Sequence, residues 1–120
     1  MPGPGNDPPD VGFTATTFSA LQALGYSSDE MAFKDGSGNF YYLFLQRKTG
    51  TIDVCEWLHA TDSDGTDRPR CDVPQLTYDV IKNGTLDTQT QKISYQGKYY
   101  RIRIMRDVSA GRQIAQAIEV

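Results

Sequence analysis

Turn signals that contain glycine recur from residue 35 onward and divide the chain into short segments. The signals are Asp35-Gly36-Ser37-Gly38, Thr49-Gly50, Asn83-Gly84 and Gln96-Gly97. Such pairs supply the positive φ angles that tight hairpin turns require. The segments between them are rich in the β-branched and aromatic residues that favour strands, as in NFYYLFLQRK, TIDVCEWLHA, LTYDVIK and KYYRIRIMR. The pattern predicts an all-β fold, an antiparallel meander of about six to eight strands that forms a small sandwich or a partly closed barrel.

One short helix is expected near the N-terminus, over residues 17–24. Phe18, Leu21 and Leu24 recur there at a helical spacing, and Gly25 supplies a stop signal. The last segment, RQIAQAIEV, alternates large apolar residues with polar or small ones. This alternation favours a strand over residues 112–120, with a short helix as the alternative.

The chain divides into an arm and a single domain. Residues 1–12 hold four of the six prolines and too little apolar surface to fold alone. They predict an extended arm that clasps a neighbouring subunit. Its candidate interface residues are Pro2, Pro4, Pro8 and Pro9. Residues 13–120 form one β-rich domain, since a chain of 120 residues and 13.4 kDa is long enough for one core.

The N-terminal sequence has neither the basic nor the apolar region of a secretory signal peptide. No apolar run approaches the roughly 20 residues that a membrane-spanning helix needs. We therefore expect a protein of the cytoplasm or of a virion, without a membrane span.

The two cysteines, Cys55 and Cys71, are too few for a disulfide scaffold or for a zinc site of four thiolates. They are a candidate disulfide that closes a loop of about 15 residues. The alternative is a pair of free, partly buried thiols in a reducing compartment.

Two neighbouring segments, residues 40–45 and 52–58, carry apolar residues on both faces of a strand. A two-residue turn at Thr49-Gly50 would pair Tyr42 with Trp57. A strand that is apolar on both faces is buried on both, or buried on one and docked to a partner on the other.

Catalytic residues do not form a recognisable set. His59 is the only histidine, and Cys55 lies four residues away on the same strand face. The Cα atoms are then roughly 13 Å apart, too far for a nucleophile and its base. Glu56 alternates with Val54 and Leu58, and a cross-strand partner or an edge position accounts for it better than acid–base chemistry does. We expect no enzyme and no cofactor.

A loop with three carboxylates, Asp62, Asp64 and Asp67, is a weak candidate for a cation site. An EF-hand loop that begins at Asp62 requires glycine at position 67 and glutamate at position 73, where this chain has aspartate and valine. Exposed turns are made of the same residue types, so no metal is expected.

The segment KYYRIRIMR separates its residues onto two faces with a period of two. The expected core face is Tyr100, Ile102 and Ile104, and the opposite face is Tyr99, Arg101, Arg103 and Met105. A face of tyrosine and arginine suits nucleic acid, but a pI of about 5.0 disfavours that partner.

Charge is divided unevenly along the chain. Residues 1–90 carry 6 basic and 13 acidic side chains, whereas residues 91–120 carry 6 basic and 2 acidic ones. This split suits complementary contacts within the fold or between adjacent subunits. It makes Tyr99, Arg101 and Arg103 candidate interface residues.

Together these features predict a structural subunit of a larger assembly, with a virion protein that decorates a phage capsid or forms part of a tail as the concrete form. One alternative is a small acidic binding module or inhibitor. A second alternative is a β-domain that binds a small ligand or catalyses a reaction.

Overall fold

The computed structural model describes residues 10–49, 52–59, 71–107 and 112–120. These residues form two helices and ten strands. The helices are α1 (Ala15–Gln22) and α2 (Gln75–Asn83). The strands are β1 (Asp10–Phe13), β2 (Gly25–Ser27), β3 (Ala32–Lys34), β4 (Phe40–Thr49), β5 (Ile52–His59), β6 (Cys71–Asp72), β7 (Thr85–Leu86), β8 (Ile93–Tyr95), β9 (Lys98–Asp107) and β10 (Arg112–Glu119).

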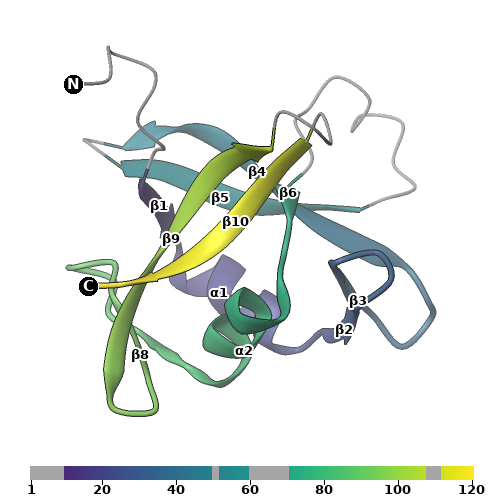
Figure 1. Ribbon diagram of the computed structural model, residues 1–120, viewed down its shortest axis with the longest axis horizontal. Coiled ribbons are helices and arrows are strands. Elements are labelled where there is room, and N and C mark those ends of the chain that lie inside the picture. Colours follow the sequence, from purple (N-terminus) through teal and green to yellow (C-terminus); the bar gives the residue numbers. More distant parts are fainter. Residues whose placement is uncertain (1–9, 50–51, 60–70, 108–111) are drawn as a thin grey trace.

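Six strands close into a barrel, in the order β1, β5, β4, β6, β10 and β9, with β9 pairing back to β1 (Figure 1). The predicted all-β class is confirmed, and the barrel is the architecture that forms. Two neighbouring pairs, β1–β5 and β6–β10, are parallel. The chain is therefore more than an antiparallel meander, because parallel neighbours need crossover connections.

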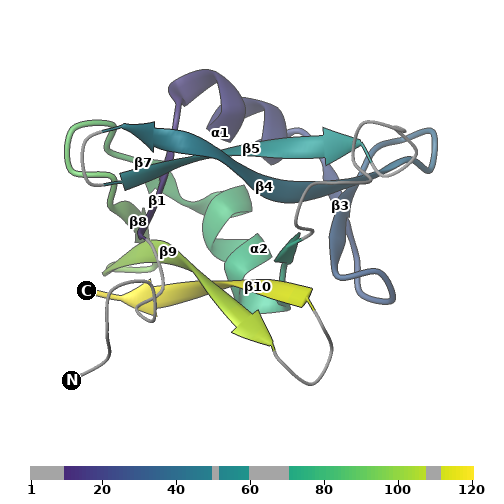
Figure 2. The ribbon, with the colours of Figure 1, turned by 90° about the horizontal axis from the view of Figure 1, so that it is seen from above.

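The core fills the barrel and the space beneath it, where α1 and α2 pack against each other (Figure 1). The β4–β5 and β9–β10 pairs face each other across the barrel (Figure 2). Leu43 from one side and Ile102 and Ile104 from the other are buried in this core. Strand β4 is also buried on its second face, through Tyr42 and Phe44, as its apolar sequence predicted.

Helix α1 confirms the predicted N-terminal helix, shifted by two residues. The side chain of Thr14 caps its start by accepting a hydrogen bond from the backbone N–H of Thr17. Phe18 and Leu21 are buried. At the other end, Lys82 Nζ donates to the carbonyl oxygen of Gln22 at 2.6 Å, so a cation from α2 satisfies the last turn of α1.

The segment LTYDVIK was predicted as a strand, and this prediction is wrong, because it forms α2. Thr77, Tyr78, Val80 and Ile81 are buried, a spacing that fits one side of a helix. Gly84 ends the helix and donates its N–H to the carbonyl oxygen of Val80 at 2.9 Å, instead of turning a hairpin.

The predicted register between β4 and β5 is also wrong. Tyr42 pairs with Leu58, not with Trp57, and Leu43 pairs with Trp57. The register shifts between Leu45 and Arg47. Beside the turn, Thr49 pairs with Ile52 and Arg47 with Val54, two positions from the predicted register, and the bulge brings the later pairs back to one position from it. The Thr49-Gly50 signal specified neither this turn position nor the bulge.

The structure corrects the predicted end of the N-terminal arm and settles the secondary structure of the C-terminal segment. Residues 10–12, predicted as part of the arm, belong to β1, and Val11 is buried. At the C-terminus β10 is a strand, so the helical alternative for residues 112–120 is wrong.

Candidate interaction surface

The two strands of the β9–β10 hairpin share one outward face. Their register sets Met105 opposite Ile114, Arg103 opposite Gln116 and Arg101 opposite Ile118. Beyond the last of these pairs, the N–H of Val120 donates to the carbonyl oxygen of Tyr99 at 2.9 Å. We call these eight residues the β9–β10 outer face: Tyr99, Arg101, Arg103, Met105, Ile114, Gln116, Ile118 and Val120.

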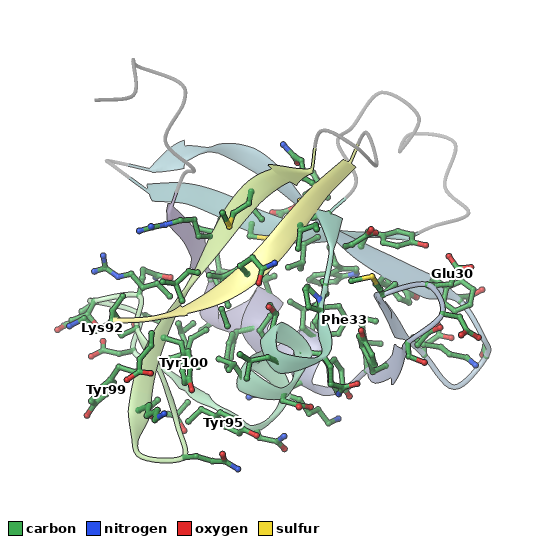
Figure 3. The ribbon with its side chains drawn as sticks, viewed as in Figure 1. Glu30, Phe33, Lys92, Tyr95, Tyr99 and Tyr100 are labelled. Carbon is green, nitrogen blue, oxygen red and sulfur yellow. The ribbon has the colours of Figure 1, made fainter. Side chains whose placement is uncertain are left out.

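The opposite face of the same hairpin turns into the core. Tyr100, Ile102 and Ile104 of β9 are buried, as the sequence alternation predicted. Figure 3 shows Tyr99 and Tyr100 on opposite sides of β9. On β10 the inward position Ala115 is fully buried, and its small side chain leaves room for α2 to pack closely. The core thus holds the hairpin in one orientation.

Three large apolar side chains are exposed on the outer face. Tyr99 is 56% exposed, Val120 is 53% exposed and Met105 is 40% exposed. Within the described ranges, one other large apolar side chain is exposed to this extent, Leu76 on α2 at 50%. Most of the exposed apolar surface of this kind therefore lies on one face of one hairpin.

The outer face also carries positive charge and no acidic residue. Arg101 and Arg103 are half-buried in its middle. Nη2 of Arg101 donates to the carbonyl oxygen of Thr90 at 3.1 Å, which helps to fix the side chain. Near the Tyr99 end, Lys98 and Glu119 form an ion pair of 3.7 Å with both side chains more than half exposed. Such a pair contributes at most about 1 kcal/mol.

Of the predicted interface residues, the structure places Tyr99, Arg101 and Arg103 together on this face. Pro2, Pro4, Pro8 and Pro9 lie outside the described residues, as do the metal candidates Asp62, Asp64 and Asp67. The sequence reasoning missed the contribution of β10. Its signal was the alternation of Ile114 and Ile118, which becomes informative once β10 is paired with β9.

The two cysteines are free, buried thiols, and the structure does not contain the candidate bridge. Sγ of Cys71 donates to Oε1 of Gln113 at 3.3 Å. Burial raises the pKa of Cys71 to about 12 and also raises the pKa of Cys55 well above its ordinary value. Because the thiolate is the nucleophile, both cysteines are unsuited to catalysis near neutral pH.

The remaining catalytic candidates, Glu56 and His59, both lie on β5. His59 ends β5, with its backbone opposite Tyr41, and its side chain lies outside the described part of the structure. Glu56 lies opposite Phe44 and lines a hollow of about 330 Å³ together with Trp57 and three threonines of the 14–17 segment.

A second cavity, of about 470 Å³, lies where β1 meets α1 and the segment around Gln91. Its lining consists of Gly12, Phe13, Thr14, Ala15, Val54, Thr88, Gln89 and Gln91. The amide of Gln91 is occupied by the backbone of Phe13, accepting from its N–H at 2.7 Å and donating to its carbonyl oxygen at 3.2 Å. None of the eight lining side chains is an acid, a base or a thiol, so the cavity offers contacts without catalytic groups.

The described ranges hold neither a candidate metal site nor a candidate membrane-spanning helix. They contain no group of three or more histidine, cysteine, aspartate or glutamate side chains that could hold a metal ion. No helix among the described residues is long and apolar enough to cross a membrane.

Comparisons with protein-family models, with curated proteins and with solved structures find no match to this chain.

Proposed function

We propose that this protein is a structural subunit that docks onto neighbouring subunits through the β9–β10 outer face and has no catalytic role. The observation that supports the proposal is the gathering of Tyr99, Met105 and Val120 on this face, where the rest of the described fold leaves them exposed. Tyr99 and Val120 lie side by side at one end of the face, and contiguous exposed apolar surface on a folded domain is typical of interaction sites.

The composition of the face also suits a protein partner. Tyrosine, methionine and arginine are enriched at protein interfaces, whereas lysine, glutamate and aspartate are depleted there. Tyr99 and the two arginines supply the enriched types, and the face contains none of the depleted ones. Arginine beside exposed apolar surface favours a partner with acidic and apolar groups.

The uneven distribution of charge along the chain indicates that another copy of the chain is a suitable partner. The acidic residues 1–90 of one subunit complement the basic residues 91–120 of another. The neighbouring subunits in this proposal therefore include copies of the chain itself. A virion component that decorates a capsid or builds part of a phage tail is the concrete form of the proposal.

The test is the solution mass by size exclusion with light scattering over a wide range of concentration. We expect the wild type to exceed 13.4 kDa as its concentration rises, and Tyr99→Ser to remain monomeric. Leu76→Ser is the matched control, because Leu76 is almost as exposed but lies on α2. A wild type that stays at 13.4 kDa throughout, or a Leu76→Ser variant that dissociates as readily as Tyr99→Ser, overturns the proposal.

A further inference from the structure

Residues 1–9 leave the described fold beside the middle of β9. Asp10 of β1 pairs with Arg103, and Val11 pairs with Ile102, in an antiparallel arrangement. Moving backward along β1 from Asp10 therefore means moving forward along β9, towards Asp107. The N-terminal end of β1 therefore faces the Asp107 end of the hairpin.

The exposed tyrosine lies at the other end. Tyr99 is near the start of β9, and its carbonyl oxygen accepts the hydrogen bond from the N–H of Val120. Both side chains are more than half exposed. Figure 3 shows Tyr99 pointing away from the body of the molecule. The N-terminal end of β1 thus faces the Asp107 end of β9, whereas the exposed Tyr99 lies near the other end.

The sequence of residues 1–9 has the chemistry that this end of the face would bind. Four of its nine residues are proline, Asp7 is its one acidic residue, and it contains no lysine or arginine. Proline-rich segments favour the polyproline II conformation and bind surfaces lined by aromatic side chains. On the face, Tyr99 supplies the aromatic ring, and Arg101 and Arg103 supply positive charge for Asp7.

The sequence of the segment favours a direction away from its own Tyr99. A residue before proline is restricted to extended conformations, so Asp7 and Pro8, which precede Pro8 and Pro9, favour continuation in the direction set by β1. Nine residues in polyproline II span about 28 Å. This is close to the length of β9 itself, ten residues at about 3.3 Å each, so the segment is long enough to reach across a neighbour.

We infer that residues 1–9 of one copy bind the Tyr99 end of the β9–β10 outer face of the next copy. This inference rests on the proposed function and names its partner. Because the donor segment and the acceptor face are different surfaces, the contact is head-to-tail. Copies joined in this way form a closed ring or an open filament, according to the rotation between them.

The test uses two full-length variants that each lose one half of the contact. The face variant is Tyr99→Ser. The segment variant combines Pro2→Ser, Pro4→Ser and Asp7→Asn, and it keeps Pro8, Pro9 and β1 unchanged. We expect each variant alone to remain at 13.4 kDa. A mixture of the two should form a complex of twice 13.4 kDa and nothing larger, because only one intact segment and one intact face are left to meet. Native mass spectrometry distinguishes the mixed pair from pairs of like chains.

Other outcomes separate this inference from the proposed function. A segment variant that still self-associates, while Tyr99→Ser does not, keeps the docking face and overturns the segment as its occupant. A mixture that stays monomeric while the wild type self-associates also overturns the head-to-tail contact. If Tyr99→Ser unfolds, Val120→Ser takes its place in the mixture, with the same expected result. A wild type that is monomeric throughout overturns both.

Discussion

The hydroxyl group of Thr77, on α2, donates a hydrogen bond of 2.7 Å to the carbonyl oxygen of Ala115, on β10. The hydroxyl oxygen of Thr77 also accepts a hydrogen bond from the N–H of Ala117 at 3.0 Å. Among the described residues, β10 pairs with β6 at Gln113 and Ile114. Thr77 therefore satisfies the backbone groups that a neighbouring strand would otherwise take, and it ties α2 to the hairpin that carries the outer face.

Replacing Thr77 with valine should lower the free energy of unfolding by about 1–3 kcal/mol, because two buried backbone groups lose their partner. Thr77 is 1% exposed, so water cannot easily replace the hydroxyl group. Urea denaturation measures the change. Thr77→Ser keeps the hydroxyl group and should lose less stability than Thr77→Val. A loss in Thr77→Ser as large as that in Thr77→Val, or larger, would contradict the leading role given to the hydrogen bonds.

Gly84 is packed too closely to accept a larger residue. A Cβ atom at this position would meet the carbonyl oxygen of Val80 and the Cγ2 atom of Ile93. Gly84→Ala should therefore lower the free energy of unfolding by roughly 1–3 kcal/mol through overpacking. Gly36 is the matched control, since a Cβ there meets nothing within 4 Å. Thermal unfolding should show a clear drop in midpoint for Gly84→Ala and little change for Gly36→Ala. The reverse order contradicts the packing argument.

Asp35 should make stability depend on pH in the acid range. Its carboxylate accepts hydrogen bonds from the backbone N–H groups of Asn39 and Ser37, at 3.0 and 2.9 Å, and from the hydroxyl group of Tyr41. These donors, the N–H of Asn39 first, lower the pKa of Asp35 from 3.8 to about 2. Because the folded state favours the charged form, the stabilisation is present above pH 3.8 and is lost as the pH falls towards 2.

The free energy of unfolding of the wild type should therefore fall between pH 4 and pH 2 more steeply than that of Asp35→Asn, since asparagine has no carboxylate to protonate. Chemical denaturation at a series of pH values measures both slopes. An NMR titration of the Asp35 carboxyl carbon gives the pKa directly. Parallel slopes for the two proteins, or a midpoint near 3.8 for this carboxyl group, would contradict the assignment.

Cys55 and Cys71 should resist thiol reagents while the protein is folded. Both thiols are buried, and burial raises the pKa of each above the ordinary value of 9.0. At pH 8 we expect the folded protein to react with a thiol reagent only as fast as it unfolds. In denaturant, both thiol groups should react fast. Cys71→Ala should leave a single slow thiol. A fast equivalent in the native protein would show that one thiol is accessible.

Burial of Cys71 should also make the free energy of unfolding fall at alkaline pH, whereas Asp35 makes it fall at acid pH. The unfolded chain loses its thiol protons near pH 9, whereas the folded chain keeps the proton of Cys71 to about pH 12. Stability from this group is full below pH 9 and is lost as the pH rises towards 12. Tyr26 and Tyr78 add to the loss, because burial also raises their pKa. Cys71→Ala should therefore flatten, but not abolish, the alkaline fall in stability.

Local sequence patterns predicted the parts of this fold that depend on near neighbours. The alternation of Tyr100, Ile102 and Ile104 with Tyr99 and Arg101 predicted which face of β9 is buried, because successive side chains of a strand must point to opposite sides. The spacing of Phe18 and Leu21 predicted α1 for the corresponding helical reason. The alternation of residues 112–120 favoured the strand that forms.

Local patterns were ambiguous where a short segment fitted two structures. Tyr78 and Val80 alternate as in a strand, but with Thr77 and Ile81 they also fit one side of a helix. The helix forms because its buried side meets α1, β8 and β10, and burial of that side supplies most of the stability of so short a helix. In the same way, Asn83-Gly84 suits a hairpin turn, but at this position it ends α2.

Thus the sequence by itself determined the all-β class, the position of α1 and the two faces of β9, since each depends on residues only a few positions apart. Only the tertiary structure decided that the barrel closes, through parallel pairs such as Val11 with Asp53 and Gln113 with Cys71. It also decided that Ile114 and Ile118 join Tyr99 on one surface. These pairings join distant parts of the chain, and their stability comes from closing a shared core that no local pattern specifies.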